Sequence, residues 1–268
     1  MKEFTFDEAT HTYRLGGERM TGVTTILGVI AAPALIQWAA NEAIKYIKVS
    51  AGYSEDYKPT TEKMLSVSTT VLEEARTAHR KKTDKAADIG TLTHKEVEIL
   101  IKENKLNEPY FHTNPKVEMM VNEFIKWAKH NEVEFLSSEE QVYHEELFYA
   151  GTFDFLCRIN GKIYLGDLKT SSGIYNSMFY QTAAYEHALH DKNNRENKPA
   201  IVISGHIIVN VKKVGGIDVR VSYNNVKNLE AFLAALVLYR RENEQSRGDA
   251  ETKVNGGTLN HYDIKKTQ

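Results

Sequence analysis

The sequence predicts an α/β fold in which a small central mixed β-sheet is flanked by helices, with a mostly helical extension at the N-terminal end. Helical periodicity dominates the first half of the chain, where apolar residues recur every three to four positions. From residue 131 onward the pattern changes to short segments rich in β-branched and aromatic residues, alternating with helical patterns. We therefore expect one domain with a helical part over 1–130, a sheet-containing core over 131–245 and a polar tail over 246–268.

The individual elements follow from these periodicities and from the turn residues between them. The chain opens with strand-like segments at 4–6 and 11–15, followed by a Gly16 and Gly17 turn, and the polar stretch 50–61 predicts a loop. Helices are predicted at about 33–49, 62–86, 88–103, 116–131, 175–190 and 226–244. Strands are predicted at 141–148, 150–159, 162–169, 200–211 and 217–222.

The bulk composition excludes several classes of protein. The longest apolar stretch of the N-terminal third, 26–40, is too short and too interrupted to span a bilayer. Glu3, Asp7 and Glu8 lie where a secretory signal would be basic and then apolar. Cys157 is the only cysteine, so one chain holds neither a disulfide framework nor a cysteine-based zinc or iron–sulfur site. We expect a cytosolic protein without a membrane partner.

The net charge of −2 does not by itself indicate a nucleic-acid partner, but the positive charges are clustered. The densest run contains Arg76, Arg80, Lys81 and Lys82, on the predicted helix before the one that carries His94. Contact with DNA phosphates and a solvated helix face explain such a run about equally well.

The most informative segment is the predicted hairpin 151–169. Asn-Gly between two apolar runs predicts a two-residue type I′ turn, which fixes the register so that Ile159 faces Lys162. The same register places Asp154 directly opposite Asp167 as a non-hydrogen-bonded pair, with Cα atoms about 4.5 Å apart.

Two opposed carboxylates repel each other, and burial strengthens the repulsion. Both strands are apolar on both faces, with Phe153 and Phe155 predicted on one face beside Cys157, a buried apolar filler. A shared proton, a lysine or a divalent cation must offset the repulsion, and Lys169 projects from the face that carries Asp167. Oxygen ligands with open positions suit Mg²⁺. The competing interpretation is a structural Asp–Lys ion pair.

This segment resembles the core of the PD-(D/E)XK nuclease superfamily, and most closely its RecB-like branch, which includes phage exonucleases. The family pattern places an Asp on one strand and Asp/Glu-x-Lys on the next, matched here by Asp154 and by Asp167-Leu168-Lys169. Four further matches, in order along the chain, are Thr24-Thr25-Ile26-Leu27 near the start, Gly90 to His94, Glu139 to Val142, and Gln181 to Tyr185. Phe153 replaces the proline of the family name.

The resemblance implies a restriction-endonuclease-like core and a role for each matched residue. His94, Asp154, Asp167 and the backbone carbonyl of Leu168 would hold Mg²⁺, for which Mn²⁺ can substitute. Lys169 would position the attacking water and stabilise negative charge in the transition state. Gln181 and Tyr185 would orient the site or contact the DNA backbone; without the resemblance, they form a polar pair at the boundary between helix and sheet.

Two parts of the proposed metal site keep alternative interpretations. From the residues alone, His94 is a solvated helical histidine rather than a ligand, and Glu98, one turn further on, is interpreted as a surface residue. Glu139 fits the pattern of an outer metal ligand slightly better than Glu140.

The implied function is a Mg²⁺-dependent DNA nuclease without an iron–sulfur cluster, most consistent with an exonuclease of recombination, repair or phage DNA processing in a bacterial or phage-infected cytosol. The alternatives are a catalytically inactive nucleic-acid-binding module with the same fold, and a structural protein whose Asp–Lys cluster stabilises the sheet.

Overall fold

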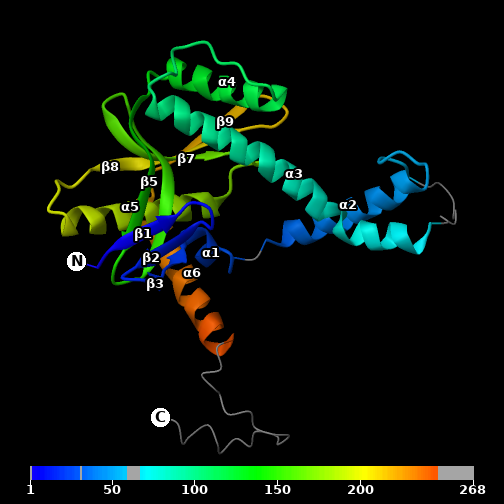
Figure 1. Cartoon of the computed structure of the whole chain (residues 1–268), viewed down its shortest axis with the longest axis horizontal. Helices are drawn as coiled ribbons and strands as arrows, with labels where there is room; N and C mark the ends of the chain where they lie inside the picture. Colours follow the sequence, from blue (N-terminus) through cyan, green and yellow to red (C-terminus); the bar gives the residue numbers. More distant parts are fainter. Residues whose placement is uncertain (1, 31, 59–66, 247–268) are drawn as a thin grey trace, which may run out of the picture.

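A mixed β-sheet lies between two layers of helices, and a helical arm projects from this body (Figure 1). The computed structural model describes residues 2–30, 32–58 and 67–246. In chain order, the elements of these residues are β1 (Phe4–Asp7), β2 (Thr12–Leu15), β3 (Glu18–Arg19), β4 (Thr21–Gly22), α1 (Val23–Leu27), α2 (Pro33–Ser50), α3 (Thr69–Lys102), α4 (Pro115–His130), β5 (Glu134–His144), β6 (Tyr149–Ile159), β7 (Lys162–Lys169), α5 (Asn176–Arg195), β8 (Ile203–Val211), β9 (Ile217–Ser222) and α6 (Asn225–Ser246).

Strand β6 organises the main sheet. Antiparallel β5 pairs along it from Tyr149 to Arg158, so β5 occupies one edge. The other edge is divided, because antiparallel β7 pairs only with Phe155–Ile159 and parallel β4 pairs only with Tyr149 and Ala150. Residues 151–154 therefore lie in a gap on this edge between β4 and β7. Parallel β8 and antiparallel β9 complete the sheet beyond β7, with α5 connecting β7 to β8.

Each face of the sheet has its own apolar core. On one face, α3 and α4 pack over Phe155, Cys157 and Leu168, so the prediction that Cys157 is a buried filler is confirmed. On the other face, α1, α5 and α6 pack over Leu156, Leu165 and their neighbours. Burial on both faces explains why the strands of the hairpin are nearly continuous apolar runs.

The predicted pair of helices at 62–86 and 88–103 is wrong, since α3 is one helix from Thr69 to Lys102, about 51 Å long at 1.5 Å per residue. Ser68 caps its start by accepting a hydrogen bond from the N–H of Val71. The break was predicted near Ala87, where no proline interrupts the helix, and Gly90 weakens a helix by only about 1 kcal/mol. Residues 62–66 lie outside the described residues.

The other elements match their predictions closely in place and type. The structure adds β3, the short β4 and the short helix α1, and β5 spans Glu134–His144 rather than the predicted 141–148. Residues 51–58 of the predicted loop contain neither helix nor strand. Residues 59–61 of that loop and 247–268 of the predicted polar tail lie outside the described residues. Within the described part of the chain, no helix is both long and apolar enough to cross a bilayer.

The arm consists of α2 packed against the first half of α3, to the right of the sheet in Figure 1. The ion pair of Lys82 with Glu42, at 2.8 Å, joins the two helices. The second half of α3 continues back across the sheet (Figure 1). The basic run and His94 therefore lie on one helix, which corrects the prediction of two.

Candidate active site

The turn of the β6–β7 hairpin has the predicted geometry. Asn160 and Gly161 have φ values of +50° and +76°, the left-handed conformation that a type I′ turn requires. Ile159 pairs with Lys162, and the same register continues to Phe155 and Gly166. The predicted register is therefore confirmed up to the position just before the two aspartates.

Beyond that point the ladder ends, so Asp154 and Asp167 do not form the predicted cross-strand pair. Oδ2 of Asp154 accepts a hydrogen bond of 2.6 Å from the backbone N–H of Leu168. On the neighbouring strand β5, Glu139 has a φ of +51° and interrupts the regular pairing opposite Asp154. The alternation of faces is broken here, so Phe153 packs with α5 and α6 whereas Phe155 packs with α3 and α4. The prediction that both rings share one face is wrong.

Asp167 begins a polar network that enters the helix layer. Its side chain is 1% exposed, and Lys169 Nζ lies 2.9 Å from Oδ1 and 2.7 Å from Oδ2. Gln181 on α5 donates hydrogen bonds from Nε2 to Asp167 Oδ1 at 3.2 Å and to Tyr185 Oη at 2.9 Å. Its Oε1 accepts a hydrogen bond of 3.3 Å from Lys169. One amide thus fixes the carboxylate, the ammonium and the phenol relative to one another.

His94 reaches the same place from the opposite face of the sheet. Its Nδ1 lies 3.5 Å from Oδ2 of Asp154. Gly90, one turn earlier on α3, makes this approach possible, because a Cβ at that position would lie 2.7 Å from Oγ1 of Thr170, the residue after β7. The Gly-x-x-x-His spacing therefore has a steric explanation. The glycine allows α3 to pack closely against Thr170, and the histidine one turn later lies beside Asp154.

We expect Gly90→Val to weaken binding of Ca²⁺ or Mg²⁺ at this site although every candidate ligand is still present. The added side chain must displace Thr170 or move α3, and such overpacking costs roughly 1–3 kcal/mol. Titration calorimetry measures the affinity. Ala87→Val is the matched control, because Ala87 is exposed on the same helix. Equal affinities in both variants and the parent would show that Gly90 does not place His94.

The structure distinguishes between the two glutamates of β5. Glu139 lines a small hollow with His94, Glu98 and Asp154, whereas Glu140 forms an ion pair of 2.8 Å with Lys192 of α5. Glu98 is therefore not a simple surface residue as interpreted from the sequence, and its four-residue spacing from His94 was the available signal. Ser138 was also missed; its hydroxyl donates to the backbone carbonyl of Asp154 at 3.0 Å.

Burial and like charge make this an unfavourable place for carboxylates. Burial raises the pKa of Asp154 to about 6 and that of Asp167 to about 6, while the Lys169 charge opposes both shifts. Burial and the charge of Asp154 raise the pKa of Glu139 to about 8. Burial, helped by Lys169, lowers the pKa of His94 to about 4. The histidine is consequently neutral at pH 7, which is the form that ligates metals.

The donors in the network fit a hard divalent cation. Oδ2 of Asp167 is buried and, among the described residues, has only the ion contact with the Lys169 ammonium at 2.7 Å, so a metal cation would compete with the ammonium for this oxygen. Two carboxylates and a neutral imidazole suit Mg²⁺ or Mn²⁺. As the described side chains are oriented, no group of three or more His, Cys, Asp or Glu is arranged around one point. Binding through Asp167 therefore requires its carboxylate to turn from Lys169.

The predicted DNA-contacting residues do not lie at this site. Twelve residues separate Lys82 from His94 on α3, which is about 18 Å along the axis. Arg76 pairs with Glu73 and Lys82 with Glu42, whereas the exposed Arg80 and Lys81 have no side-chain partner among the described residues.

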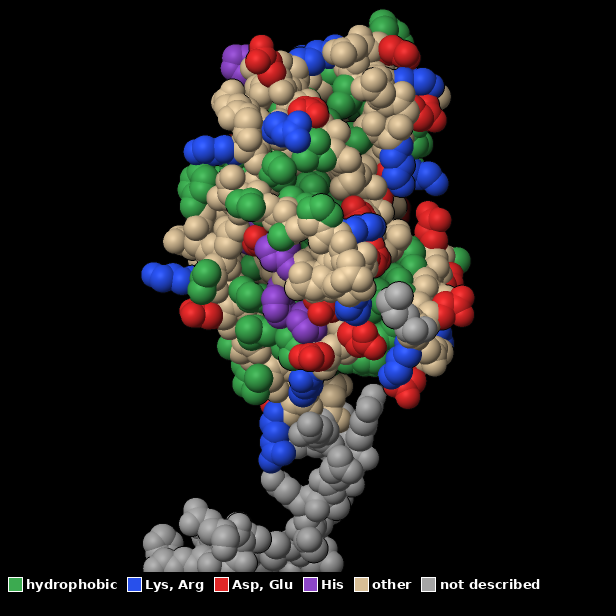
Figure 2. All heavy atoms as spheres, turned by 90° about the vertical axis from the view of Figure 1, so that its left-hand side faces the viewer, with side chains coloured by type: hydrophobic (Ala, Val, Ile, Leu, Met, Phe, Trp, Pro, Cys, Tyr) green, Lys and Arg blue, Asp and Glu red, His purple; other side chains and the backbone are tan. Residues whose placement is uncertain are grey.

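The side of the molecule turned to the viewer in Figure 2 offers no alternative basic surface. Lys and Arg side chains there are interspersed with Asp and Glu, around a group of histidines. In this view no broad area of positive charge forms.

The comparisons with known proteins add no relative: the chain matches no family model, and no curated protein matches it.

Proposed function

We propose that this protein is a Mg²⁺-dependent deoxyribonuclease with a PD-(D/E)XK core of the RecB-like type, acting as an exonuclease. The observation that carries the proposal is the convergence of His94, Asp154, Asp167 and Lys169 at a gap in the sheet, reached from helices on both faces. A structural ion pair needs only Asp167 and Lys169. The interpretation as a structural ion pair leaves unexplained why the carboxylate of Asp154 and the neutral imidazole of His94 are buried beside these residues at a cost in stability.

In this proposal, Asp154, Asp167, His94 and the carbonyl of Leu168 hold the cation, with Glu139 as an outer ligand. Bound Mg²⁺ or Mn²⁺ supplies Lewis-acid stabilisation of phosphoryl charge and makes a bound water more acidic. Lys169, held by Asp167 and Gln181, supplies an ammonium that orients the attacking water and stabilises the charge developing on the phosphate. Gln181 and Tyr185 keep Lys169 and Asp167 in this arrangement.

Digestion of end-labelled linear DNA and closed circular DNA, with Mg²⁺ or with EDTA, tests the proposal. We expect Mg²⁺-dependent digestion of the linear DNA and no cleavage of the circle. Cleavage of the circle would reassign the activity to an endonuclease. DNA binding without cleavage of either substrate, in Mg²⁺ or Mn²⁺, would favour the inactive nucleic-acid-binding module instead.

The arm supplies part of the proposed DNA-binding surface through Arg80 and Lys81. We expect the double variant Arg80→Ala/Lys81→Ala to flatten the dependence of DNA affinity on salt, because each phosphate contact contributes a slope of about −0.9 on duplex DNA. Lys82 is left unchanged, since its removal would take the nearer of two lysine partners from the buried Glu42 and leave Lys45 at 3.6 Å. Binding is measured in Ca²⁺, which should occupy the site without supporting turnover.

Arg220→Ala/Lys227→Ala is the matched control, because both residues are exposed on other elements. Its salt slope should stay at the parental value. If the arm variant also keeps the parental slope, then the arm does not contact DNA and the basic run is a solvated helix face.

A further inference from the structure

The short segment that connects β7 to α5, residues 170–175, joins the two elements that hold the Lys169 ammonium. Lys169 is the last residue of β7, and Gln181, whose Oε1 accepts a hydrogen bond of 3.3 Å from that ammonium, lies on the second turn of α5. The same segment lies against α3, because a Cβ at Gly90 would be 2.7 Å from Oγ1 of Thr170. A shift of this segment would therefore move the lysine relative to the amide that fixes it.

A buried side chain of the neighbouring strand binds this segment. Asn210 is 0% exposed and lies opposite Lys169 at the last paired position of the parallel ladder between β7 and β8. Its Oδ1 accepts a hydrogen bond of 3.0 Å from the backbone N–H of Ser171, and its Nδ2 donates one of 3.2 Å to the backbone carbonyl of Ser171. The side-chain amide thus extends the pairing of β7 with β8 beyond the end of β7.

The side chain of Asn210 points to the face of the sheet that carries Lys169. Val209 and Val211 belong to the core under α3 and α4, whereas Ile208 belongs to a cluster with side chains of α5. Successive side chains of a strand point to opposite faces, so Asn210 lies on the α5 face with Ile208. The ammonium of Lys169 meets α5 on that same face.

An apolar side chain at this buried position would leave two polar groups without partners. In the described part of the chain, the backbone N–H and carbonyl of Ser171 bond to Asn210 and to no other group. The hydroxyl of Ser171 donates a hydrogen bond of 2.6 Å to the carbonyl of Gly173, so the residue that Asn210 holds also shapes the turn toward α5. A buried amide costs stability unless it is bonded, and here its bonds converge on one residue of the connection.

We propose that Asn210 is a positioning residue for the Lys169 ammonium. By holding Ser171, it sets the end of β7 against the start of α5. The ammonium then stays between Asp167 and Gln181, where a displacement of about 1 Å costs on the order of 100-fold in rate. The inference rests on the proposed nuclease function for the role of the ammonium in cleavage, whereas the position of the ammonium can be measured without any cleavage.

The test compares the parent with Asn210→Ala and Asn228→Ala. Asn228 on α6 is the matched control, because its amide is also buried and also binds a serine, donating from Nδ2 to Ser222 Oγ at 3.0 Å. The first measurement is the ¹⁵Nζ resonance of Lys169 in protein that carries [¹⁵Nζ]lysine, assigned by its loss in Lys169→Arg. The second is kcat and KM for linear DNA in Mg²⁺.

In Asn210→Ala, water can bond to the backbone groups of Ser171 without fixing them to β8. We expect the Lys169 signal to move toward those of exposed lysines and its ammonium hydrogens to exchange faster. The kcat should fall by about 10- to 100-fold while KM stays near the parental value. Asn210→Thr, which keeps one hydroxyl for Ser171, should lie between alanine and the parent, and Asn228→Ala should match the parent in every measurement.

A parental Lys169 signal or a parental kcat in Asn210→Ala would overturn the proposal, and so would equal changes in Asn228→Ala. A raised KM with parental kcat would assign Asn210 to substrate binding instead. If neither Asn210 variant folds while Asn228→Ala does, then the amide serves only the stability of the sheet and the proposal is wrong. If the parent cleaves no DNA but the Lys169 signal moves only in the Asn210 variants, then the nuclease proposal fails and the positioning of the ammonium stands.

Discussion

Lys169→Ala should abolish DNA cleavage, with a loss of at least about 100-fold in kcat, the scale seen when one transition-state donor is removed. Lys169 is the cation of the network, 2.9 Å from Asp167 Oδ1 and fixed by Gln181. Asp167→Asn should have an effect of the same size, because the amide is a poor cation ligand. Steady-state cleavage of labelled DNA in saturating Mg²⁺ measures both.

The two variants should differ in stability, which separates chemistry from folding. Asp167→Asn keeps the shape and the hydrogen bond to Lys169 and removes repulsion from Asp154, so its free energy of unfolding should equal or exceed that of the parent. Lys169→Ala leaves Asp167 buried without its partner and should be less stable. Lys192→Ala, which removes an ion-paired ammonium of α5 outside the candidate site, is the control and should cleave at the parental rate. A Lys169→Ala protein that cleaves as fast as the parent would remove Lys169 from the mechanism.

Without a divalent cation, the stability of the protein should respond to pH through the buried carboxyls. The pKa of Asp154 and of Asp167 rises from 3.8 unfolded to about 6 folded, and that of Glu139 from 4.5 to about 8. A raised folded-state pKa means that the folded protein binds more protons, so these groups lose stabilisation as pH rises from about 4 to about 8.

His94 acts in the opposite direction over part of this range. Its pKa falls from 6.5 unfolded to about 4 folded, so it gains stabilisation as pH rises between those values. Three carboxyls against one imidazole still give a net loss. Urea unfolding from pH 4 to 8 in EDTA should therefore show that Asp154→Asn gains stability relative to the parent as pH rises, whereas His94→Gln loses it.

A divalent cation should reverse this loss at neutral pH, because binding to the folded state adds stability as the logarithm of its concentration over Kd. Saturating Mg²⁺ or Ca²⁺ should raise the free energy of unfolding of the parent at pH 7.5, and Asp154→Ala should show most of this gain abolished. His94→Ala should lose less, since one neutral ligand of several is removed. Equal metal stabilisation in the parent and in Asp154→Ala would place the cation elsewhere.

Local rules predicted most of the fold and the centre of the site. The Asn160 and Gly161 turn fixed the register of the hairpin because a type I′ turn allows only one pairing. The features that were missed depend on contacts between distant segments. The left-handed Glu139 redirects the chain opposite Asp154, and no neighbouring residue signals it. The continuity of α3 follows from packing at both of its ends, against α2 and against the sheet.

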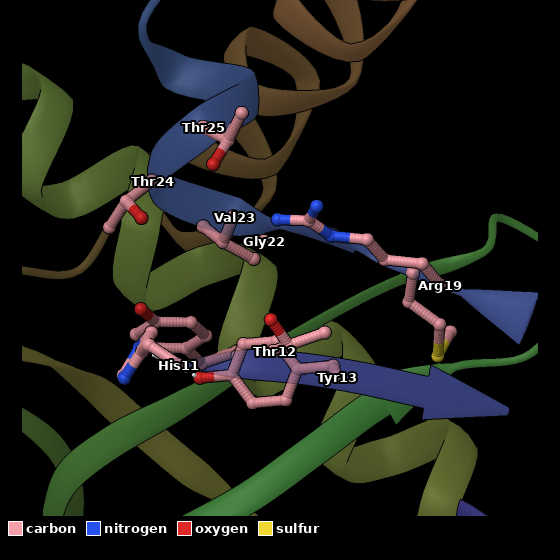
Figure 3. A pocket seen from close by; sticks show the side chains of 11 residues that line it. His11, Thr12, Tyr13, Arg19, Gly22, Val23, Thr24 and Thr25 are labelled. Carbon is pink, nitrogen blue, oxygen red and sulfur yellow. Dashed lines mark hydrogen bonds between the residues drawn. The ribbon is translucent and has the colours of Figure 1, made fainter. Parts of the chain in front are cut away.

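The small polar cavity beside β4 (Figure 3) was also beyond local rules. It is formed by Arg19 and Thr24 near the start of the chain and by Gly151 and Tyr185 more than a hundred residues later. Sequence patterns singled out Thr24 and Tyr185 separately, but only the parallel pairing of β4 with β6 brings them to one place.

The most direct test of the central claim is the location of Mn²⁺ by anomalous scattering in crystals of the parent protein, compared with crystals of Asp154→Ala. The account predicts a peak about 2 Å from carboxylate oxygens of both Asp154 and Asp167, close to His94, and its loss in the variant. A parent that cleaves DNA in Mn²⁺ but binds the ion away from these two carboxylates, or keeps the same peak in Asp154→Ala, would contradict it.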